Sequence, residues 1–134
     1  MLKRIDQVGI IVDDLDAASR LLGDVLGMTF VRSVEIPERQ LHAVFYRCGD
    51  TNIELIQLDD PEARASRLGD GPARVEHIAI EVDGTIDEAA PMLAEAGVRM
   101  ASDEPMRTKA SVSLWSDPDS THGVAFQFLE HLTP

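Results

Sequence analysis

The chain has 134 residues, of which 44% are hydrophobic and 27% charged, a composition typical of one compact globular domain and too short for two independent ones. Its 12 Lys and Arg against 24 Asp and Glu give a net charge of -12, which disfavours nucleic acid and anionic membranes as partners. A single cysteine, Cys48, cannot form an internal disulfide, and no apolar stretch approaches the roughly 20 residues of a membrane helix. We therefore expect a cytoplasmic protein that does not associate with membranes.

The first half of the chain, about residues 3–58, predicts a strand, a helix and three more strands. The segment Ile5–Val12 is rich in β-branched residues and is followed by Asp14, a residue that suits a helix N-cap. Apolar residues then recur at helical spacing from Leu15 to Leu26, and Gly27 lies where a left-handed C-terminal cap is expected. The three strands that follow are expected at Thr29–Ile36, Leu41–Cys48 and Thr51–Leu58.

The second half, about residues 74–130, repeats this order after a short helix predicted at Pro61–Leu68. Its helix is expected to begin with a capping box of Thr85 and Glu88. Pro91 removes an interior hydrogen bond, so we expect either a late start or a kink in that helix. The strands of this half are expected at Val75–Val82, Val98–Met100, Ser111–Trp115 and Val124–Leu129.

Alternation along the strands separates a helix-packing face from a face with polar residues. The residues predicted to face the helices are Val8, Ile10 and Val12 and, in the repeat, Ile78, Ile80 and Val82. The opposite faces of these two strands carry Gln7 and His77, and the last strands of the halves carry Glu54 and Gln127 in corresponding places. Four polar residues in sheet interiors need either a ligand or one another as partners.

Two βαβββ modules that open with IDQVGI or VEHIAI and close with IELIQ or AFQFLE resemble the vicinal oxygen chelate superfamily. That superfamily includes glyoxalase I, methylmalonyl-CoA epimerase, extradiol dioxygenases and bleomycin-resistance proteins. The likeness is closest to methylmalonyl-CoA epimerase, through the segments RIDQVGIIVDDLDAA, GDTNIELIQ and RVEHIAIEV. The resemblance implies an α+β fold in which the two modules of a single domain, residues 1–134, form paired curved mixed sheets around a cleft.

The resemblance also implies a metal site. Proteins of this superfamily place one metal ligand on the first and last strand of each module, and the matching residues here are Gln7, Glu54, His77 and Gln127. The expected cofactor is a divalent ion, namely zinc, cobalt, nickel or manganese. The expected activity is that of an isomerase or lyase of the epimerase or glyoxalase type, acting next to the carbonyl of a small-molecule substrate such as an acyl-CoA or another thioester.

Two of the four positions depart from the epimerase pattern, which has His at the first and Glu at the last. Here both are glutamine, Gln7 and Gln127, and an amide cannot accept a proton from carbon. Glu54 is then the candidate catalytic base, because the third-strand position where some bacterial epimerases carry a second acid is Ala43. The departures favour an alternative function, a metal-free small-molecule binding or resistance protein in which His77 and its neighbours are a self-satisfied polar cluster.

Three further expectations concern residues outside the ligand set. We expect a homodimer, because two small open sheets leave apolar edges and faces to cover. Phe30, Phe45 and Trp115 are expected in the core, with Trp115 the best candidate for lining a pocket. His42 is expected on the face away from Glu54, and His131, near the end of the last strand, is expected in solvent.

Overall fold

A computed structural model describes residues 1–133. The chain divides into two compact units. The central unit is Gln7–Glu76, and the terminal unit combines Met1–Asp6 with the chain from His77 onward. The two boundaries fall inside strands β1 (Leu2–Val12) and β5 (Ala73–Val82).

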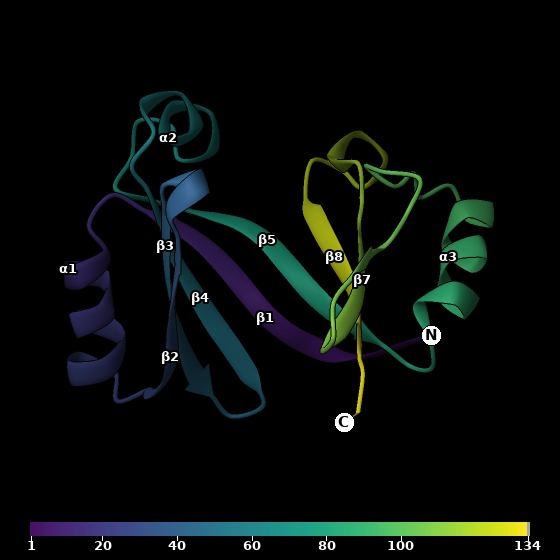
Figure 1. Cartoon of the computed structure of the whole chain (residues 1–134), viewed down its shortest axis with the longest axis horizontal. Helices are drawn as coiled ribbons and strands as arrows, with labels where there is room; N and C mark the ends of the chain where they lie inside the picture. Colours follow the sequence, from purple (N-terminus) through teal and green to yellow (C-terminus); the bar gives the residue numbers. More distant parts are fainter. Residues whose placement is uncertain (134) are drawn as a thin grey trace. The chain divides into compact units, whose positions relative to one another are not determined.

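The central unit contains a four-stranded sheet in the order β2-β3-β4-β1. Strand β1 pairs in parallel with β4, whereas the pairs β2–β3 and β3–β4 are antiparallel. Helix α1 lies along one face of these strands (Figure 1), and α2 follows β4. The remaining elements of this unit are α1 (Leu15–Arg20), η1 (Leu21–Val25), β2 (Thr29–Ile36), η2 (Pro37–Arg39), β3 (Leu41–Cys48), β4 (Thr51–Leu58) and α2 (Pro61–Arg67).

The helix predicted from Leu15 to Leu26 is α-helical only in its first part. Asp14 caps it by accepting from the Ala17 N–H, but from Leu21 the helix widens into the π-helical segment η1. The Leu26 N–H donates to the carbonyl of Leu21, five residues back. Gly23 lies in this wider turn, where a Cβ atom would be 3.1 Å from the Tyr46 ring. The expectation of a continuous α-helix is therefore wrong, and its end at Gly27, with φ 74°, is confirmed.

The two faces of the central sheet bury different clusters. On the α1 side, Val12 and Leu55 pack with Tyr46 and Leu22 of η1. On the opposite side, a second cluster includes Phe45, confirming its place in the core, and a residue that follows α2. The same expectation is wrong for Phe30, which is 55% exposed because it lies near the start of the edge strand β2. The members of this second cluster are Ile11, Ala43, Phe45, Ile56, Leu58 and Leu68. We call the side opposite α1 the Glu54 face, because Glu54 alternates with Ile56 and pairs with Phe45 there.

The terminal unit repeats the same arrangement with the strand order β5-β8-β7-β6. Strand β5 pairs in parallel with β8, and the pairs β7–β8 and β6–β7 are antiparallel. The matching topology confirms the predicted α+β fold of two βαβββ modules. The further elements here are α3 (Ile86–Glu95), β6 (Met106–Arg107), β7 (Ser111–Trp115), η3 (Pro118–Ser120) and β8 (Ala125–His131).

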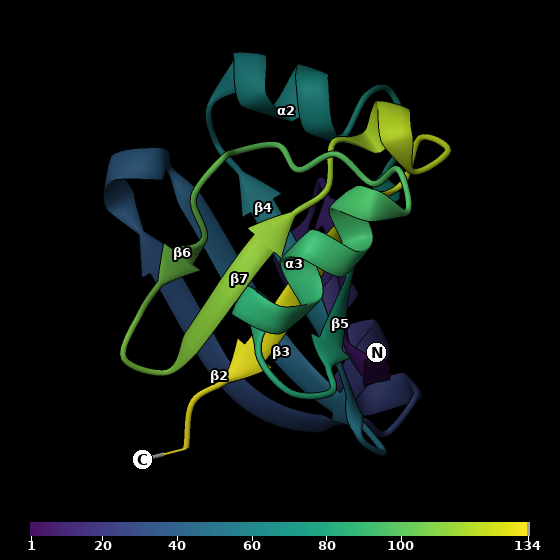
Figure 2. The ribbon, with the colours of Figure 1, turned by 90° about the vertical axis from the view of Figure 1, so that its right-hand side faces the viewer.

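Helix α3 lies across one face of this second sheet (Figure 2) and buries a cluster against it. The cluster consists of Val82, Ile86, Ala89, Leu93, Val112, Leu114 and Phe128. The helix begins at Ile86 with the predicted capping box, in which the Glu88 N–H donates to Thr85 Oγ1. The expectation that this helix starts late is therefore wrong. Pro91 is tolerated because it lies on the exposed side of α3, where its ring removes the N–H donor to only one carbonyl.

The strand expected at Val98–Met100 is also wrong. The Val98 N–H donates to the carbonyl of Leu93 and so completes the end of α3. Met100 forms a single isolated bridge with Ser116. The strand next to β7 is instead the two-residue β6, farther along the chain. No helix among residues 1–133 is long and apolar enough to cross a membrane.

Candidate functional site

In the central unit, Gln7 and Glu54 lie together on adjacent parallel strands. Gly9 is opposite Glu54 in the β1–β4 register, so Gln7 and Glu54 point to the same face. The Gln7 Nε2 atom donates a hydrogen bond of 3.2 Å to Glu54 Oε1. Both side chains are half-buried. The structure therefore brings together the two predicted ligands of this unit, and the amide orients the carboxylate.

A fixed positive charge lies near Glu54. Arg67, in the last turn of α2, donates two hydrogen bonds of 2.6 and 2.7 Å to the carboxylate of Glu76. These bonds raise the pKa of Arg67 against the opposing effect of burial, and the charge of Glu54 contributes in the same direction. Ala43, which shares this face, is 2% exposed and adds no acid to it.

In the terminal unit, His77 and Gln127 also lie on one face, the one opposite α3. Strands β5 and β8 pair with Ala79 opposite Gln127, which puts His77 two residues away on the same side. The two side chains are 3% and 8% exposed. Trp115 pairs with Gln127 across β7 and β8, and its ring meets the His77 ring edge-on at 5.0 Å between centroids. Trp115 thus lies beside the polar residues, as its alternation predicted.

Two buried oxygens on this face, Gln127 Oε1 and Ser113 Oγ, make no hydrogen bond within residues 1–133. A buried acceptor left without a donor costs about 1–3 kcal/mol, so such atoms usually have a ligand, an ion or a bound water as partner. An amide oxygen, an imidazole and a carboxylate are all accepted ligand types for divalent ions. The donor set of Gln7, Glu54, His77 and Gln127 is therefore chemically compatible with a divalent metal, with one strong anionic ligand in it.

A second group of ionisable residues in the terminal unit did not follow from the sequence. Ligand atoms of Asp6, Glu81 and His131 lie within 4.8 Å of one another. His131 is exposed, as expected, and its Nε2 atom is also 2.7 Å from Asp6 Oδ1. Arg4 donates to both carboxylates, at 2.8 Å to Asp6 and 2.9 Å to Glu81. Because Arg4 already forms ion pairs with both acids, we interpret this group as a structural ion-pair network.

His42 lies outside the Glu54 face, as predicted. It alternates with Val44 and Tyr46 toward the α1 side, at the edge where β2 and β4 end. One ring nitrogen is 2.6 Å from Asp59, and the other contacts Glu35. The hydrogen bond to Asp59 is the main reason that the pKa of His42 is raised, with a smaller contribution from Glu35.

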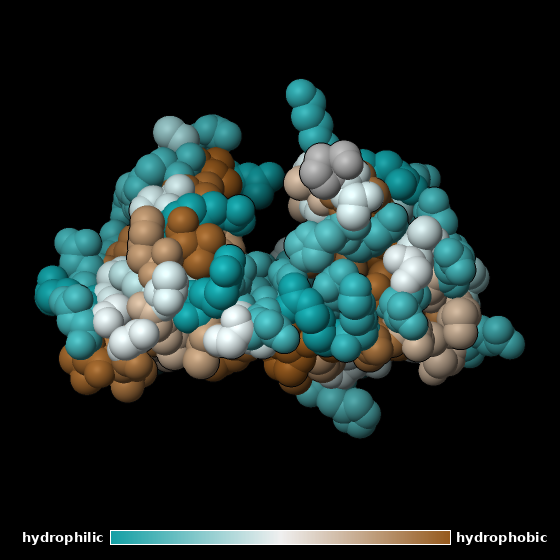
Figure 3. Space-filling model, turned by 90° about the horizontal axis from the view of Figure 1, so that it is seen from below, coloured by the Kyte–Doolittle hydropathy of each residue, from teal (hydrophilic) through white to brown (hydrophobic). Residues whose placement is uncertain are grey.

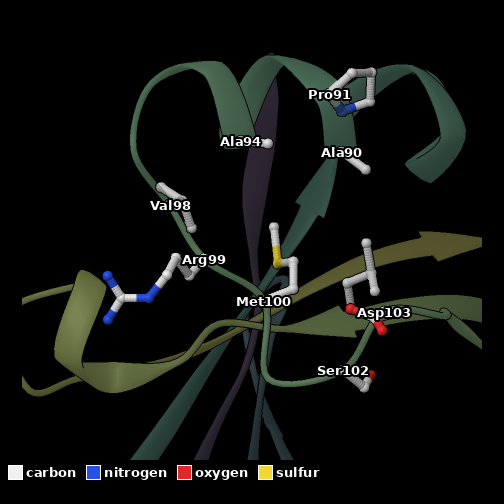
Figure 4. A pocket seen from close by; sticks show the side chains of 9 residues that line it. Ala90, Pro91, Ala94, Val98, Arg99, Met100, Ser102 and Asp103 are labelled. Atoms are coloured by element: carbon white, nitrogen blue, oxygen red, sulfur yellow. The ribbon is translucent and has the colours of Figure 1, made fainter.

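A surface pocket of about 560 Å³ lies between α3 and the segment that follows it. Figure 4 shows Ala90 and Ala94 of the helix facing Met100. None of the four predicted ligands lines this pocket, so it is separate from the polar residues described above. Its lining residues are Ala90, Pro91, Ala94, Val98, Arg99, Met100, Ser102, Asp103 and Leu114.

Residues 6–114 match a family model described as the glyoxalase/bleomycin resistance protein/dioxygenase superfamily. The chain is 32% identical over 105 residues to the mitochondrial methylmalonyl-CoA epimerase of Mus musculus. That match covers 77% of this chain and 58% of the mouse protein. The chain therefore spans about three fifths of the length of this curated relative.

Two solved structures show the same fold. The methylmalonyl-CoA epimerase of Mycobacterium tuberculosis has a TM-score of 0.84 at 24% identity, covering 98% of this chain and 90% of that one. A variant of the Streptomyces coelicolor methylmalonyl-CoA epimerase, in complex with 2-nitronate-propionyl-CoA, has a TM-score of 0.79 at 23% identity. It covers 99% of this chain and 100% of that one.

Proposed function

Because this chain belongs to the glyoxalase/bleomycin resistance protein/dioxygenase superfamily, we propose that it is an epimerase of a CoA thioester of the methylmalonyl type. The reaction inverts the carbon that carries both a carboxylate and a thioester carbonyl. The names of the curated relatives and the acyl-CoA analogue in a structural neighbour support this substrate class. The structural observation that carries the proposal is the Glu54 carboxylate, held by Gln7 on a sheet face that is otherwise largely apolar.

We assign proton transfer to Glu54. The hydrogen on the substrate α-carbon is acidified by the adjacent carbonyl, and a half-buried carboxylate oriented by a hydrogen bond is a suitable acceptor. The proton passes to a Glu54 oxygen, the C–H electron pair moves into the enolate, and the proton returns to the same carbon. Gln127 cannot take either role, since an amide does not accept this proton, and Ala43 has no acid group. With one carboxylate, inversion requires the enolate to turn or water to supply the proton on the opposite side.

We also propose that Gln7, Glu54, His77 and Gln127 are ligands of a divalent metal ion. The buried Gln127 oxygen, which has no hydrogen-bond donor among residues 1–133, supports this assignment. The edge contact of Trp115 restricts the orientation of the His77 ring. When bound, a divalent ion would polarise the thioester carbonyl and stabilise the enolate.

The decisive assay for the activity follows deuterium incorporation at the α-carbon of methylmalonyl-CoA in heavy water, together with conversion of one epimer into the other. Glu54→Gln keeps the size and the hydrogen-bonding capacity of the side chain and should slow both by about 10²–10⁴-fold. Glu38→Gln, an exposed carboxylate in η2 of the same unit, is the matched control and should have no effect. Full activity of Glu54→Gln would contradict the role of Glu54 as the base.

Metal content is measured by inductively coupled plasma mass spectrometry on protein purified without chelator. We expect near-stoichiometric metal in the wild type and little in His77→Ala. His122→Asn is the control, because His122 lies in an exposed turn with φ 58°, a conformation that asparagine tolerates. Absence of metal after incubation with zinc, cobalt, nickel or manganese would contradict the ligand assignment.

One observation favours a second function, a metal-free small-molecule binding or resistance protein. Both Gln127 and Ala43 stand where the epimerase pattern has acids. A binding protein needs no proton acceptor at these positions and could use the buried amide and hydroxyl oxygens as anchors for a ligand. Absence of deuterium exchange together with absence of metal would favour this function.

We retain the homodimer as a proposal. Apolar side chains gather at the left of the view in Figure 3, where Figure 1 places the end of α1 and the start of β2. In this stretch of the chain, from η1 to the start of β2, Leu21, Val25, Leu26 and Phe30 are each at least half exposed, with Val25 at 72%. An apolar patch of this kind is more often covered by a partner than left in water.

A further inference from the structure

A β-bulge in the central unit turns a cation toward the Glu54 face. Strands β2 and β3 pair with a register shift between Phe30 and Arg32. Phe30 lies opposite Tyr46, on the α1 side, whereas Arg32 lies opposite Phe45, on the Glu54 face. In a regular strand two residues that are two apart share a face, so Phe30 and Arg32 would both lie on the α1 side. The extra residue in β2 therefore re-aims the Arg32 side chain.

Arg32 is held in place by an aromatic ring. Its guanidinium lies over the Phe45 ring, 4.3 Å from the ring centre. Phe45 is 6% exposed, so the ring is a fixed platform. In the sheet register Phe45 is also opposite Glu54 on β4. Arg32, Phe45 and Glu54 thus occupy one row across the adjacent strands β2, β3 and β4, with the guanidinium above the middle residue of the row.

The charge of Arg32 is not neutralised by the protein. No carboxylate within residues 1–133 forms an ion pair with it, whereas Arg67, the other cation near Glu54, is engaged by Glu76. The chain as a whole has a net charge of -12, and Glu54 itself is an acid. An anionic group brought close to Glu54 is repelled by that carboxylate, and Arg32 provides positive charge that offsets this repulsion in addition to the metal ion proposed above.

We propose that Arg32 binds the free carboxylate of a malonyl-type thioester and so determines substrate specificity. This inference rests on the proposed function and names the group that selects the substrate. In such a thioester the carboxylate is attached to the same carbon from which Glu54 removes the proton. A guanidinium held above Phe45 has N–H donors that can make a bidentate contact with a carboxylate. The role is one of binding, distinct from proton transfer by Glu54.

The test uses isothermal titration calorimetry to compare the affinities for malonyl-CoA and acetyl-CoA, two thioesters that differ only by the carboxylate. We expect the wild type to bind malonyl-CoA at least about tenfold more tightly, as for a charge-assisted bidentate contact. Arg32→Leu should abolish this preference and leave acetyl-CoA affinity within about twofold of wild type, while Arg32→Lys, a point charge without the fork, should keep part of it. Arg20→Leu, the same charge change on exposed α1, should keep the full preference.

The outcomes separate the inference from the proposed function. An unchanged malonyl preference in Arg32→Leu, equal loss of both affinities, or no preference in the wild type would each overturn the role of Arg32. If the wild type prefers malonyl-CoA through Arg32 but does not exchange the α-proton of methylmalonyl-CoA, the binding role stands and the epimerase function fails. Circular dichroism of Arg32→Leu verifies that this exposed substitution leaves the fold intact.

Discussion

Replacing Gln127 by leucine should have opposite effects on stability with and without metal. Leucine is close to glutamine in size and removes the buried amide oxygen that lacks a hydrogen-bond donor among residues 1–133. Its removal relieves a desolvation penalty of about 1–3 kcal/mol. With an unfolding entropy of about 2.1 cal/mol/K per residue, a chain of 134 residues should melt about 4–11 °C higher in chelator.

With metal in excess the order should reverse. An ion present at a hundred times its dissociation constant stabilises the wild type by about 2.7 kcal/mol and stabilises a variant without the site much less. The assay is thermal unfolding by circular dichroism, run in EDTA and again with the metal that the purified protein contains. The expected result is that Gln127→Leu melts at a higher temperature than the wild type in EDTA and at a lower temperature with metal.

Gln57→Leu is the matched control for this prediction. Gln57 accepts from the Leu15 N–H at 2.9 Å and donates to Asp59 at 3.2 Å, so its amide is satisfied. Its replacement should destabilise the protein equally in both conditions. Destabilisation of Gln127→Leu in EDTA by more than about 1 kcal/mol would refute the reasoning, because it would show that the Gln127 amide makes favourable contacts in the metal-free protein.

Three further outcomes follow from the structure. Protonated His42 stabilises the fold through Asp59 and Glu35. Because its pKa is raised above 6.5, this contribution is complete below that pH and is lost as pH rises through the folded-state pKa, so His42→Gln should flatten the pH dependence of the urea midpoint above pH 6.5. Gln127→Glu should strengthen metal binding and turnover if the protein is an enzyme, whereas unchanged or weaker ligand binding is the result for a metal-free binder. Light scattering should give a dimer for the wild type and a smaller mass for Val25→Asp, and a wild-type monomer at every concentration would count against the apolar patch as a partner surface.

The modular fold could be predicted from the sequence because its signals are local and occur twice. Two-residue alternation placed Val12 and Val82 against the helices and left Gln7 and His77 on the other faces, as the clusters show. The resemblance supplied the ligand set. Pairing of Gln7 with Glu54 then followed from the parallel register of the first and last strands of one module.

Features that depend on tertiary packing could not be predicted. The π-helical turn forms where Gly23 packs beneath the Tyr46 ring, a contact with a strand more than twenty residues away. The bulge that re-aims Arg32 is a register shift between two strands, and its residue types give no sign of it. The contact of His131 with Asp6 could not be predicted either, because the two residues lie at opposite ends of the chain.

The terminal unit is built from two segments that are far apart in the sequence, and this has a consequence for folding during biosynthesis. Residues 7–76 are contiguous and include both strands that flank β4, so they can fold as soon as they leave the ribosome. The other unit joins Met1–Asp6 to the chain from His77 onward, and the contact between Asp6 and His131 spans almost the full length. Residues 1–6 must wait until the chain from His77 to His131 has been translated, and closing so long a loop adds an entropic barrier. Deletion of residues 1–6 should therefore impair the terminal unit first and leave residues 7–76 less affected.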